Sequence, residues 1–363
     1  MSFSEPDTDI LVPAFDVRAL ARRAAVPAAA AAVAAGAIVI AGGPLHAFAH
    51  ALRRALDADP RWVIGGAVFE LLSFAGYVAL FWMVGSRASK RLGLSESTQV
   101  TLGGAAATRL LPTAGVGGAA VTLWSLRRSG MGAREATRTL LGFLIVLYSV
   151  FLGAIAISGG LIALGIASGD GPLALSAVPC AAATLAIAGA LALGLRRPRT
   201  PRRAARLHAA ADVFGAAVRD AIGHVRSADP RLLGALAWWT FDASVLWAML
   251  HAFGAPPPFA VVVLAYFVGQ VGNTIPIPGA VSGGIVGVLV AFAVPADLAL
   301  VSVLAYRAIA IWLPAPIGLV ALGSLRRTMT RWSDEDAPAE PTPAPVPVAR
   351  TSRPCPEPAL LAA

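Results

Sequence analysis

Apolar tracts alternate with short polar segments along this chain, and most of them are long enough to cross a bilayer as a helix. Such a helix needs roughly 20 apolar residues. Six tracts are predicted to be spans, at residues 26–40, 62–85, 140–166, 173–195, 232–253 and 298–322. The first tract is rich in alanine, and Ala47-Phe48-Ala49 after it resembles a signal-peptidase site. Because a long, partly acidic segment precedes that tract, a retained span is preferred to a signal peptide.

Two other apolar tracts are interrupted by residues that break helices. Proline removes a backbone donor, and glycine permits unusual backbone angles. The breaks are Pro112 and Gly115 within residues 100–124, and Pro276, Pro278 and Gly279 within residues 259–294. Each arm has roughly 10 to 12 residues, which is short for a full span. We therefore predict a re-entrant hairpin at each break, with two full spans per break as the alternative.

Clusters of arginine and lysine predict the orientation, because such clusters concentrate in cytoplasmic loops. They lie at residues 18–23, 87–91, 127–134, 196–206 and 326–331. Counting spans from a cytoplasmic N-terminus brings every cluster to the cytoplasm when the two hairpins enter from opposite sides. The Pro112 hairpin then enters from the cytoplasm and the Pro276 hairpin from outside. Both termini are predicted to be cytoplasmic.

Composition supports an integral membrane protein. Of the 363 residues, 57% are hydrophobic and 13% are charged, against about 25% charged in soluble domains. The net charge of +9 comes from basic residues beside the apolar tracts, which argues against nucleic-acid binding. The two cysteines, Cys180 and Cys355, indicate no disulfide framework. No metal-ligand spacing, nucleotide motif or catalytic constellation is apparent, so we expect no metal, no cofactor and no enzyme activity.

The predicted topology contains two units of opposite orientation, residues 62–167 and 231–323, which we interpret as an inverted repeat. Inverted repeats with broken helices are a transporter architecture. Between them lies the basic cytoplasmic loop 196–230, whose helical pattern fits either a membrane-surface helix or a plain connector. The predicted fold is an all-α polytopic membrane protein with about six transmembrane helices and two opposed hairpins. The predicted domains are a cytoplasmic tail, a transmembrane domain and a disordered cytoplasmic tail, at 1–25, 26–327 and 328–363.

Charged residues inside the apolar tracts are the candidate binding site, because an unpaired charge at membrane depth is costly. They are Glu70, Arg109, Asp242 and Arg307, joined as candidates by the polar residues Asn273 and Tyr306. The arginines suit a lipid phosphate, since guanidinium offers a planar pair of donors. The carboxylates would take up protons or balance charge. The structural alternative is that these charges pair with one another, for example Glu70 with Arg109, and only lock the bundle.

Several short motifs together resemble the flippase-like membrane proteins, the lysylphosphatidylglycerol synthetase transmembrane-region family. These motifs are Leu111-Pro112 with Gly115 and Gly117-Gly118, Leu126 to Gly130, Asn273 to Gly279, Val303 to Arg307, and Trp312 to Gly318. The resemblance covers about residues 60–327. It implies a lipid-handling protein of the bacterial inner membrane, without the aminoacyl-transferase domain of the best-understood relatives. The family often carries an acid soon after the second motif. Here Ala280 and residues 281–286 contain none, which implies a different substrate.

The function expected on these grounds is the flipping of a phospholipid or polyprenyl-linked lipid between leaflets of the plasma membrane. The expected partners are membrane lipids with an anionic or polyprenyl-phosphate headgroup, and a membrane enzyme is a further candidate. A proton-coupled small-solute transporter is the first alternative. A non-transporting accessory subunit of a cell-envelope glycosyltransferase is the second.

Overall fold

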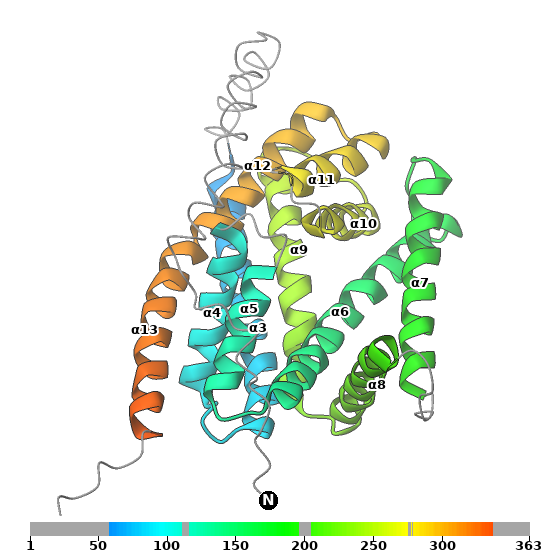
Figure 1. Ribbon diagram of the computed structural model, residues 1–363. Helices are drawn as coiled ribbons and strands as arrows, with labels where there is room; N and C mark the ends of the chain where they lie inside the picture. The colour runs from blue at the N-terminus through cyan, green and yellow to red at the C-terminus, as the bar shows by residue number, and fades with distance from the viewer. Residues whose placement is uncertain (1–57, 111–115, 196–204, 275–276, 278, 337–363) are drawn as a thin grey trace, which may run out of the picture.

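The computed structural model describes residues 58–110, 116–195, 205–274, 277 and 279–336, and the side chains of 109–110 and 205–210 lie outside that description. Every regular element in these ranges is helical (Figure 1). In chain order the elements are α3 (Pro60–Ala88), α4 (Leu94–Leu110), α5 (Val116–Arg128), α6 (Ala133–Ala163), α7 (Leu173–Leu195), α8 (Ala205–Arg226), η1 (Pro230–Leu232), α9 (Leu233–Phe253), α10 (Phe259–Gln270), η2 (Val271–Thr274), α11 (Ala280–Ala291), α12 (Ala296–Trp312) and α13 (Pro314–Glu335).

Five stretches of helix in the described residues are long and apolar enough to cross a membrane. They are α3, α6, α7, η1 with α9, and α12 with α13. These match five of the six predicted spans, and the remaining one, residues 26–40, lies outside the described residues. Two shorter apolar helices, Phe259–Thr274 and Ala280–Ala291, form the second predicted hairpin. The structure therefore confirms an all-α polytopic membrane protein.

The centre of the bundle is an antiparallel pair formed by α3 and α9. Near the start of α3, Gly66 lies against Met249, which is near the end of α9. Further along α3, the Ser73 hydroxyl donates a 2.8 Å hydrogen bond to the carbonyl of Trp238, which is near the start of α9. The two helices therefore run in opposite directions.

The two central helices come closest at a pair of glycines. A Cβ on Gly76 would lie 2.8 Å from the Gly234 carbonyl oxygen and 2.7 Å from the Cβ of Ala237. No side chain fits there, so the α3 and α9 backbones touch directly. Small residues permit such close approach between membrane helices, where packing rather than hydrophobic exclusion drives association.

Two helical hairpins flank this pair from opposite ends of the bundle. In Figure 1 the α4–α5 hairpin starts and finishes at the end where α13 ends, and the α10–α11 hairpin lies at the other end. The arms of each hairpin are held together by glycine. Gly118 lies against Gly104 in the first hairpin, and Gly284 lies against Gly269 in the second. The opposed arrangement predicted from the charge clusters is thus present in the helix arrangement.

Each hairpin packs against the closing helix of the other half. The first half closes with α6, which contacts α10, and the second half closes with α13, which contacts α4. On the first side, the rings of Phe151 and Phe267 lie 5.2 Å apart between centroids. On the second, Gly318 fits closely over Ala106. Two units that exchange closing helices in this way are the arrangement expected of an inverted repeat.

The last predicted span is two helices that meet at Pro314. Proline has no N–H to continue the hydrogen-bond ladder, which accounts for the break. α13 then continues to Glu335, past residue 328, where the tail was predicted to begin. It remains helical there because Met329 and Trp332 continue its buried stripe, at 2% and 5% exposed. The Arg91 guanidinium lies over the Trp332 ring, 5.8 Å from the centroid.

Helix α8 packs against α6 and α7, and both predicted roles, a membrane-surface helix and a plain connector, stay predictions. Val218 is buried against Gly194 on α7, and Arg219 donates a 3.0 Å hydrogen bond to the Gly194 carbonyl. Arg138 on α6 pairs with Asp220 on α8 through two hydrogen bonds. The part of α8 around Val218 therefore packs against neighbouring helices.

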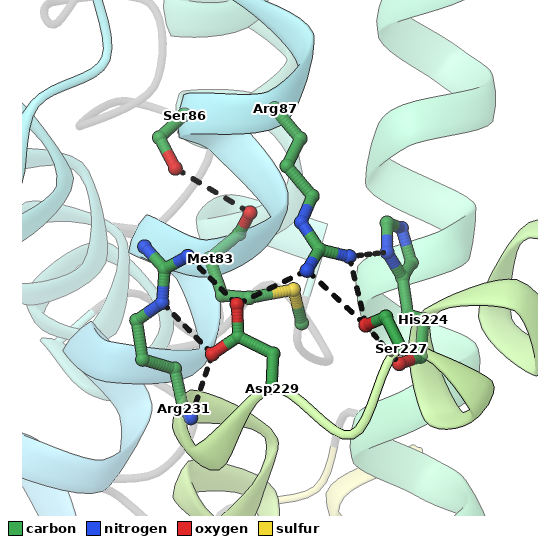
Figure 2. A network of polar contacts seen from close by, with 7 residues as sticks. All are labelled: Met83, Ser86, Arg87, His224, Ser227, Asp229 and Arg231. Atoms are coloured by element: carbon green, nitrogen blue, oxygen red, sulfur yellow. Dashed lines mark hydrogen bonds and ion pairs between the residues drawn. The ribbon is translucent and has the colours of Figure 1, made fainter.

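A polar cluster joins the end of α3 to the α8–α9 connection (Figure 2). The Asp229 carboxylate accepts from Arg87 at 3.0 Å and from Arg231 at 2.7 Å. Arg87 also contacts Nδ1 of His224 at 3.0 Å and donates to Ser227 at 3.1 Å. The Arg231 guanidinium holds the pKa of Asp229 well below its ordinary value. Burial, followed by the charge of Arg87, lowers the pKa of His224.

Candidate functional site

A carboxylate lies in the core of the bundle, where helices from three places in the chain meet. Asp242 on α9 is 2% exposed. The Tyr266 hydroxyl on α10 donates a 2.5 Å hydrogen bond to its Oδ2, and the Tyr306 hydroxyl on α12 makes a longer one of 3.5 Å to the same oxygen. The Gln270 amide on α10 donates at 2.9 Å to the Tyr306 hydroxyl oxygen. One central helix, the second hairpin and a closing span thus share one polar network.

The charge of this carboxylate has no counter-charge in the described part of the chain. None of the ion pairs among the described residues includes Asp242, and its Oδ1 is buried without a hydrogen-bond partner. An ionised carboxylate removed from water costs several kcal/mol unless it is paired. Two tyrosine donors offset only part of that cost. No described group therefore compensates a charge on Asp242.

A second acid lies at the same level on the facing helix. Glu70 on α3 is fully buried. Glu70 lies between two contacts of α3 with α9, that of Gly66 with Met249 and that of Ser73 with Trp238. This antiparallel register places Glu70 opposite Asp242. Two acids in one low-dielectric region disfavour simultaneous ionisation. The predicted repeat made these two residues counterparts, and the fold brings them together at its centre.

Aromatic rings line the carboxylate network on the side of α6. Trp239 lies on α9 directly after Trp238. Its indole N–H donates a 2.8 Å hydrogen bond to the Leu147 carbonyl on α6. Its ring lies 5.0 Å from that of Phe151 and 5.7 Å from that of Phe267. With the Trp239 donor satisfied, this wall presents apolar ring surface. It keeps the dielectric around Asp242 low on that side.

One arginine inside the bundle also stands without a counter-charge. Arg307 on α12 follows Tyr306 and is half-buried. It has no ion pair or side-chain hydrogen bond with any described residue. By contrast, Arg87, Arg138 and Arg231 each pair with an aspartate. An unpaired guanidinium at this depth marks a place where an anion would be held.

The inner ends of both hairpins approach the stretch of α12–α13 that carries Arg307. In the first hairpin, Gly103 lies against Leu322 and Ala106 against Gly318. Continuing that antiparallel register for one more turn places the end of α4 at the level of Pro314. In the second hairpin, Gln270 bonds to Tyr306. Arg307 therefore lies next to the residue that the second hairpin contacts, on a closing span against which the first hairpin also packs.

The structure brings together some of the predicted site residues. Asp242 and Tyr306 share a hydrogen bond, Glu70 faces them across α3, and Arg307 is the neighbour of Tyr306. Asn273 lies in η2 about one turn beyond Gln270 and is exposed.

Of the other predicted site residues and helix breaks, the structure describes only Gly279 in full. The side chain of Arg109 and the breaks Pro112, Gly115, Pro276 and Pro278 lie outside the described residues. Gly279, at φ 85°, precedes α11 in the left-handed region, which suits glycine.

Sequence reasoning missed two members of the network, Tyr266 and Gln270. Their spacing of four residues places them on one face of α10. That polar pair in an otherwise apolar helix is a signal that could have identified them. Among the described residues, no group of three histidine, cysteine, aspartate or glutamate side chains is placed to hold a metal ion.

Comparison with known proteins gives one family match. The model of the family described as lysylphosphatidylglycerol synthase TM region matches residues 25–318. The match includes both halves of the bundle and all the network residues described above. A search of curated proteins finds no match.

Proposed function

The chain belongs to the lysylphosphatidylglycerol synthase TM-region family, and from that premise we propose that it translocates a lipid between membrane leaflets. The lipid would be a phospholipid or a polyprenyl-linked lipid with a phosphate in its headgroup. No covalent step is involved. The observation that carries the proposal is Arg307, a half-buried cation that has no counter-charge among the described residues and lies beside the end of the second hairpin.

The chemistry of Arg307 suits a phosphate that has left the aqueous headgroup region. Guanidinium is weakly hydrated and presents two parallel donors to phosphate oxygens. Its charge would be neutralised by the headgroup while the lipid is in transit. The polar Gln270–Tyr306 pair lies beside it on the second hairpin and α12. A lipid headgroup would thus meet a cation and neutral donors within one low-dielectric site.

The proposal places the protein in the bacterial plasma membrane with both termini cytoplasmic. The basic ends of α3, α5 and α13 carry Arg91, Arg128 and Arg331, and the α3 and α13 ends are tied by the 2.6 Å pair of Arg91 with Asp336. That shared basic end fits the positive-inside rule. The α4–α5 hairpin would then be re-entrant from the cytoplasm and α10–α11 from outside. A membrane enzyme that makes or uses the lipid would be the natural partner.

The test is lipid translocation in reconstituted vesicles. Purified protein is placed in phosphatidylcholine and phosphatidylglycerol vesicles that contain a trace of fluorescent phosphatidylglycerol, and dithionite bleaching reports the outer leaflet. We expect the wild type to speed translocation above protein-free vesicles. Arg307→Gln should lower the protein-dependent rate by about tenfold or more, because a charge-assisted contact of about 1.5–3 kcal/mol is lost.

A matched control removes the same charge elsewhere on the same closing span. Arg326 lies on α13 and is exposed, so Arg326→Gln should leave the rate unchanged. Size-exclusion chromatography and thermal unfolding would show that both variants fold. Equal translocation by the Arg307→Gln and wild-type proteins would overturn the proposal.

A further inference from the structure

We propose that Asp242 binds and releases a proton in each transport cycle, so that lipid movement is coupled to proton movement. The inference rests on the proposed function and adds its energy source. It starts from geometry, because Asp242 is a buried carboxyl with two tyrosine donors and an Oδ1 that has no partner. That free oxygen is where a proton would add.

The groups that face Asp242 are mostly neutral. α10 contributes the Tyr266 hydroxyl and the Gln270 amide, and α12 contributes the Tyr306 hydroxyl. The facing group on α3 is Glu70, whose negative charge would oppose ionisation of Asp242. Arg307 is the neighbour of Tyr306 in the chain and forms no ion pair with Asp242.

The remaining elements that pack against α9 add no charge at Asp242 from their described residues. On α6 the nearest titratable group is Tyr148, whose ring lies 6.0 Å from that of Trp239 rather than against Asp242. On α9 itself, His251 is more than two turns away and stacks with Trp62 at 4.3 Å. No described cation on these elements therefore offsets a charge on Asp242.

The donors of Asp242 come from elements other than α9 itself. Tyr266 belongs to the second hairpin and Tyr306 to the closing span beside Arg307. A shift of either element would change the number of donors and the access of water at Asp242. Because linkage is reciprocal, a headgroup that shifts α12 through Arg307 changes the proton affinity of Asp242, and the proton changes the headgroup affinity.

The proton step needs no other reactant than water. On uptake, a hydronium ion that reaches the site gives its proton to the Asp242 carboxylate, forming an O–H bond and leaving water. On release, that O–H bond breaks, and water takes the proton. With a monoanionic phosphate on Arg307 and a proton on Asp242, the loaded site gains no net charge over the site with Asp242 ionised and Arg307 unoccupied.

An activity-independent measurement tests proton binding directly. Infrared difference spectra of the purified protein between acidic and alkaline buffer should contain the C=O band of a protonated carboxylic acid. We expect Asp242→Asn to remove that band. Asp170→Asn, at an exposed aspartate in the α6–α7 turn, should retain it. Tyr266→Phe keeps the acid but removes its 2.5 Å donor, so the band should shift rather than vanish. Identical spectra for wild type and Asp242→Asn would overturn the inference.

The closing experiment separates coupling from transport itself. Vesicles with fluorescent phosphatidylglycerol are given a one-unit pH gradient, with and without a protonophore. If one proton moves with each lipid, the leaflet distribution should shift by up to about tenfold in the wild type, and the protonophore should abolish the shift. Asp242→Asn should show no response to the gradient.

The outcomes point to different failures. Wild-type translocation that ignores the gradient would overturn proton coupling and leave the proposed function standing. No protein-dependent translocation in any vesicle would overturn the proposed function and the coupling with it. Tyr306→Phe provides a second variant in case Asp242→Asn does not fold, and it should weaken the response because one donor to Asp242 is lost.

Discussion

Two polar clusters in this bundle surround an aspartate in opposite ways. At the basic end, Asp229 is held between Arg87 and Arg231, and its side chain is 11% exposed. In the core, Asp242 receives two tyrosine hydroxyls and no cation from the described residues. The first cluster compensates its charges and joins helices. The second leaves a charge uncompensated where water is scarce.

The difference distinguishes polar residues that join helices from polar residues that are candidates for binding. A compensated cluster at the edge of a bundle ties the α8–α9 connection to α3 (Figure 2). An uncompensated acid in the core does not stabilise the fold, since an apolar or neutral residue of similar size would cost less. The proposed proton binding would account for its presence. The following predictions test that contrast, from the largest expected effect to the smallest.

The largest effect is expected where α3 and α9 touch. Gly76→Leu would force a side chain against the Gly234 carbonyl and Ala237, neither of which can move without moving a helix. Overpacking there should cost about 3 kcal/mol or more and separate Glu70 from Asp242. Size-exclusion profiles and thermal unfolding in detergent would measure it. Gly65→Leu is the control, because a Cβ at Gly65 meets nothing within 4 Å. Equal stability of the two variants would contradict this packing.

A smaller effect is expected at the compensated end. Trp332→Ala would remove a side chain that is 5% exposed and lies under Arg91. Burial of that size indicates a loss of about 3 kcal/mol, with transport retained in the protein that stays folded. Thermal unfolding gives the first quantity and the vesicle assay the second. Trp312→Ala, at a residue that is 72% exposed, should hardly change the unfolding temperature. A larger loss in that control would argue against the assigned packing.

One substitution made in both clusters should have opposite effects on stability. Asp242→Asn removes an uncompensated charge, so the free energy of unfolding should stay level or rise by about 1–2 kcal/mol while the gradient response is lost. Asp229→Asn removes the shared partner of Arg87 and Arg231, so the unfolding temperature should fall while the gradient response remains. Paired unfolding and vesicle measurements decide it. Changes of the same sign in both variants would break the comparison.

The smallest effect is a pH dependence at the compensated cluster. The pKa of His224 is lower in the folded protein than its ordinary value of about 6.5. Above that value both folded and unfolded states are neutral, and no stability depends on it. As the pH falls below it, the unfolded state takes the proton more readily, so stability is lost down to the folded-state pKa.

Thermal unfolding at about pH 7.5 and about pH 5.5 would measure this loss. His224→Asn lacks the titrating ring, so its unfolding temperature should fall less over the same interval. An equal fall in both proteins would assign the pH dependence to other groups.

Much of the architecture could be predicted from the sequence. Apolar length identified the spans, and the basic clusters predicted that the hairpins oppose each other. The break at Pro314 and the helix beyond residue 328 were missed. The second was missed because Met329 and Trp332 lie among polar and charged residues, so the sequence of a helix that packs against α4 resembles that of a polar tail.

The candidate site was predictable where it carries charge. Asp242, Glu70 and Arg307 stand out in apolar tracts. Tyr266 and Gln270 carry no charge, so a search for charged residues in apolar tracts does not identify them. That Glu70 faces Asp242 follows from the register of α3 on α9. The register is set by the fit of Gly76 on Gly234, which no single-helix pattern contains.

The contact of Gly76 with Gly234 has a mechanical consequence. Backbone against backbone leaves no side chain that could adjust, so any rocking of α9 against α3 would pivot at this contact. At 1.5 Å per residue, Asp242 lies about 12 Å from that contact and the far end of α9 about 28 Å. A rocking motion would therefore carry the outer end of α9 more than twice as far as the carboxyl of Asp242.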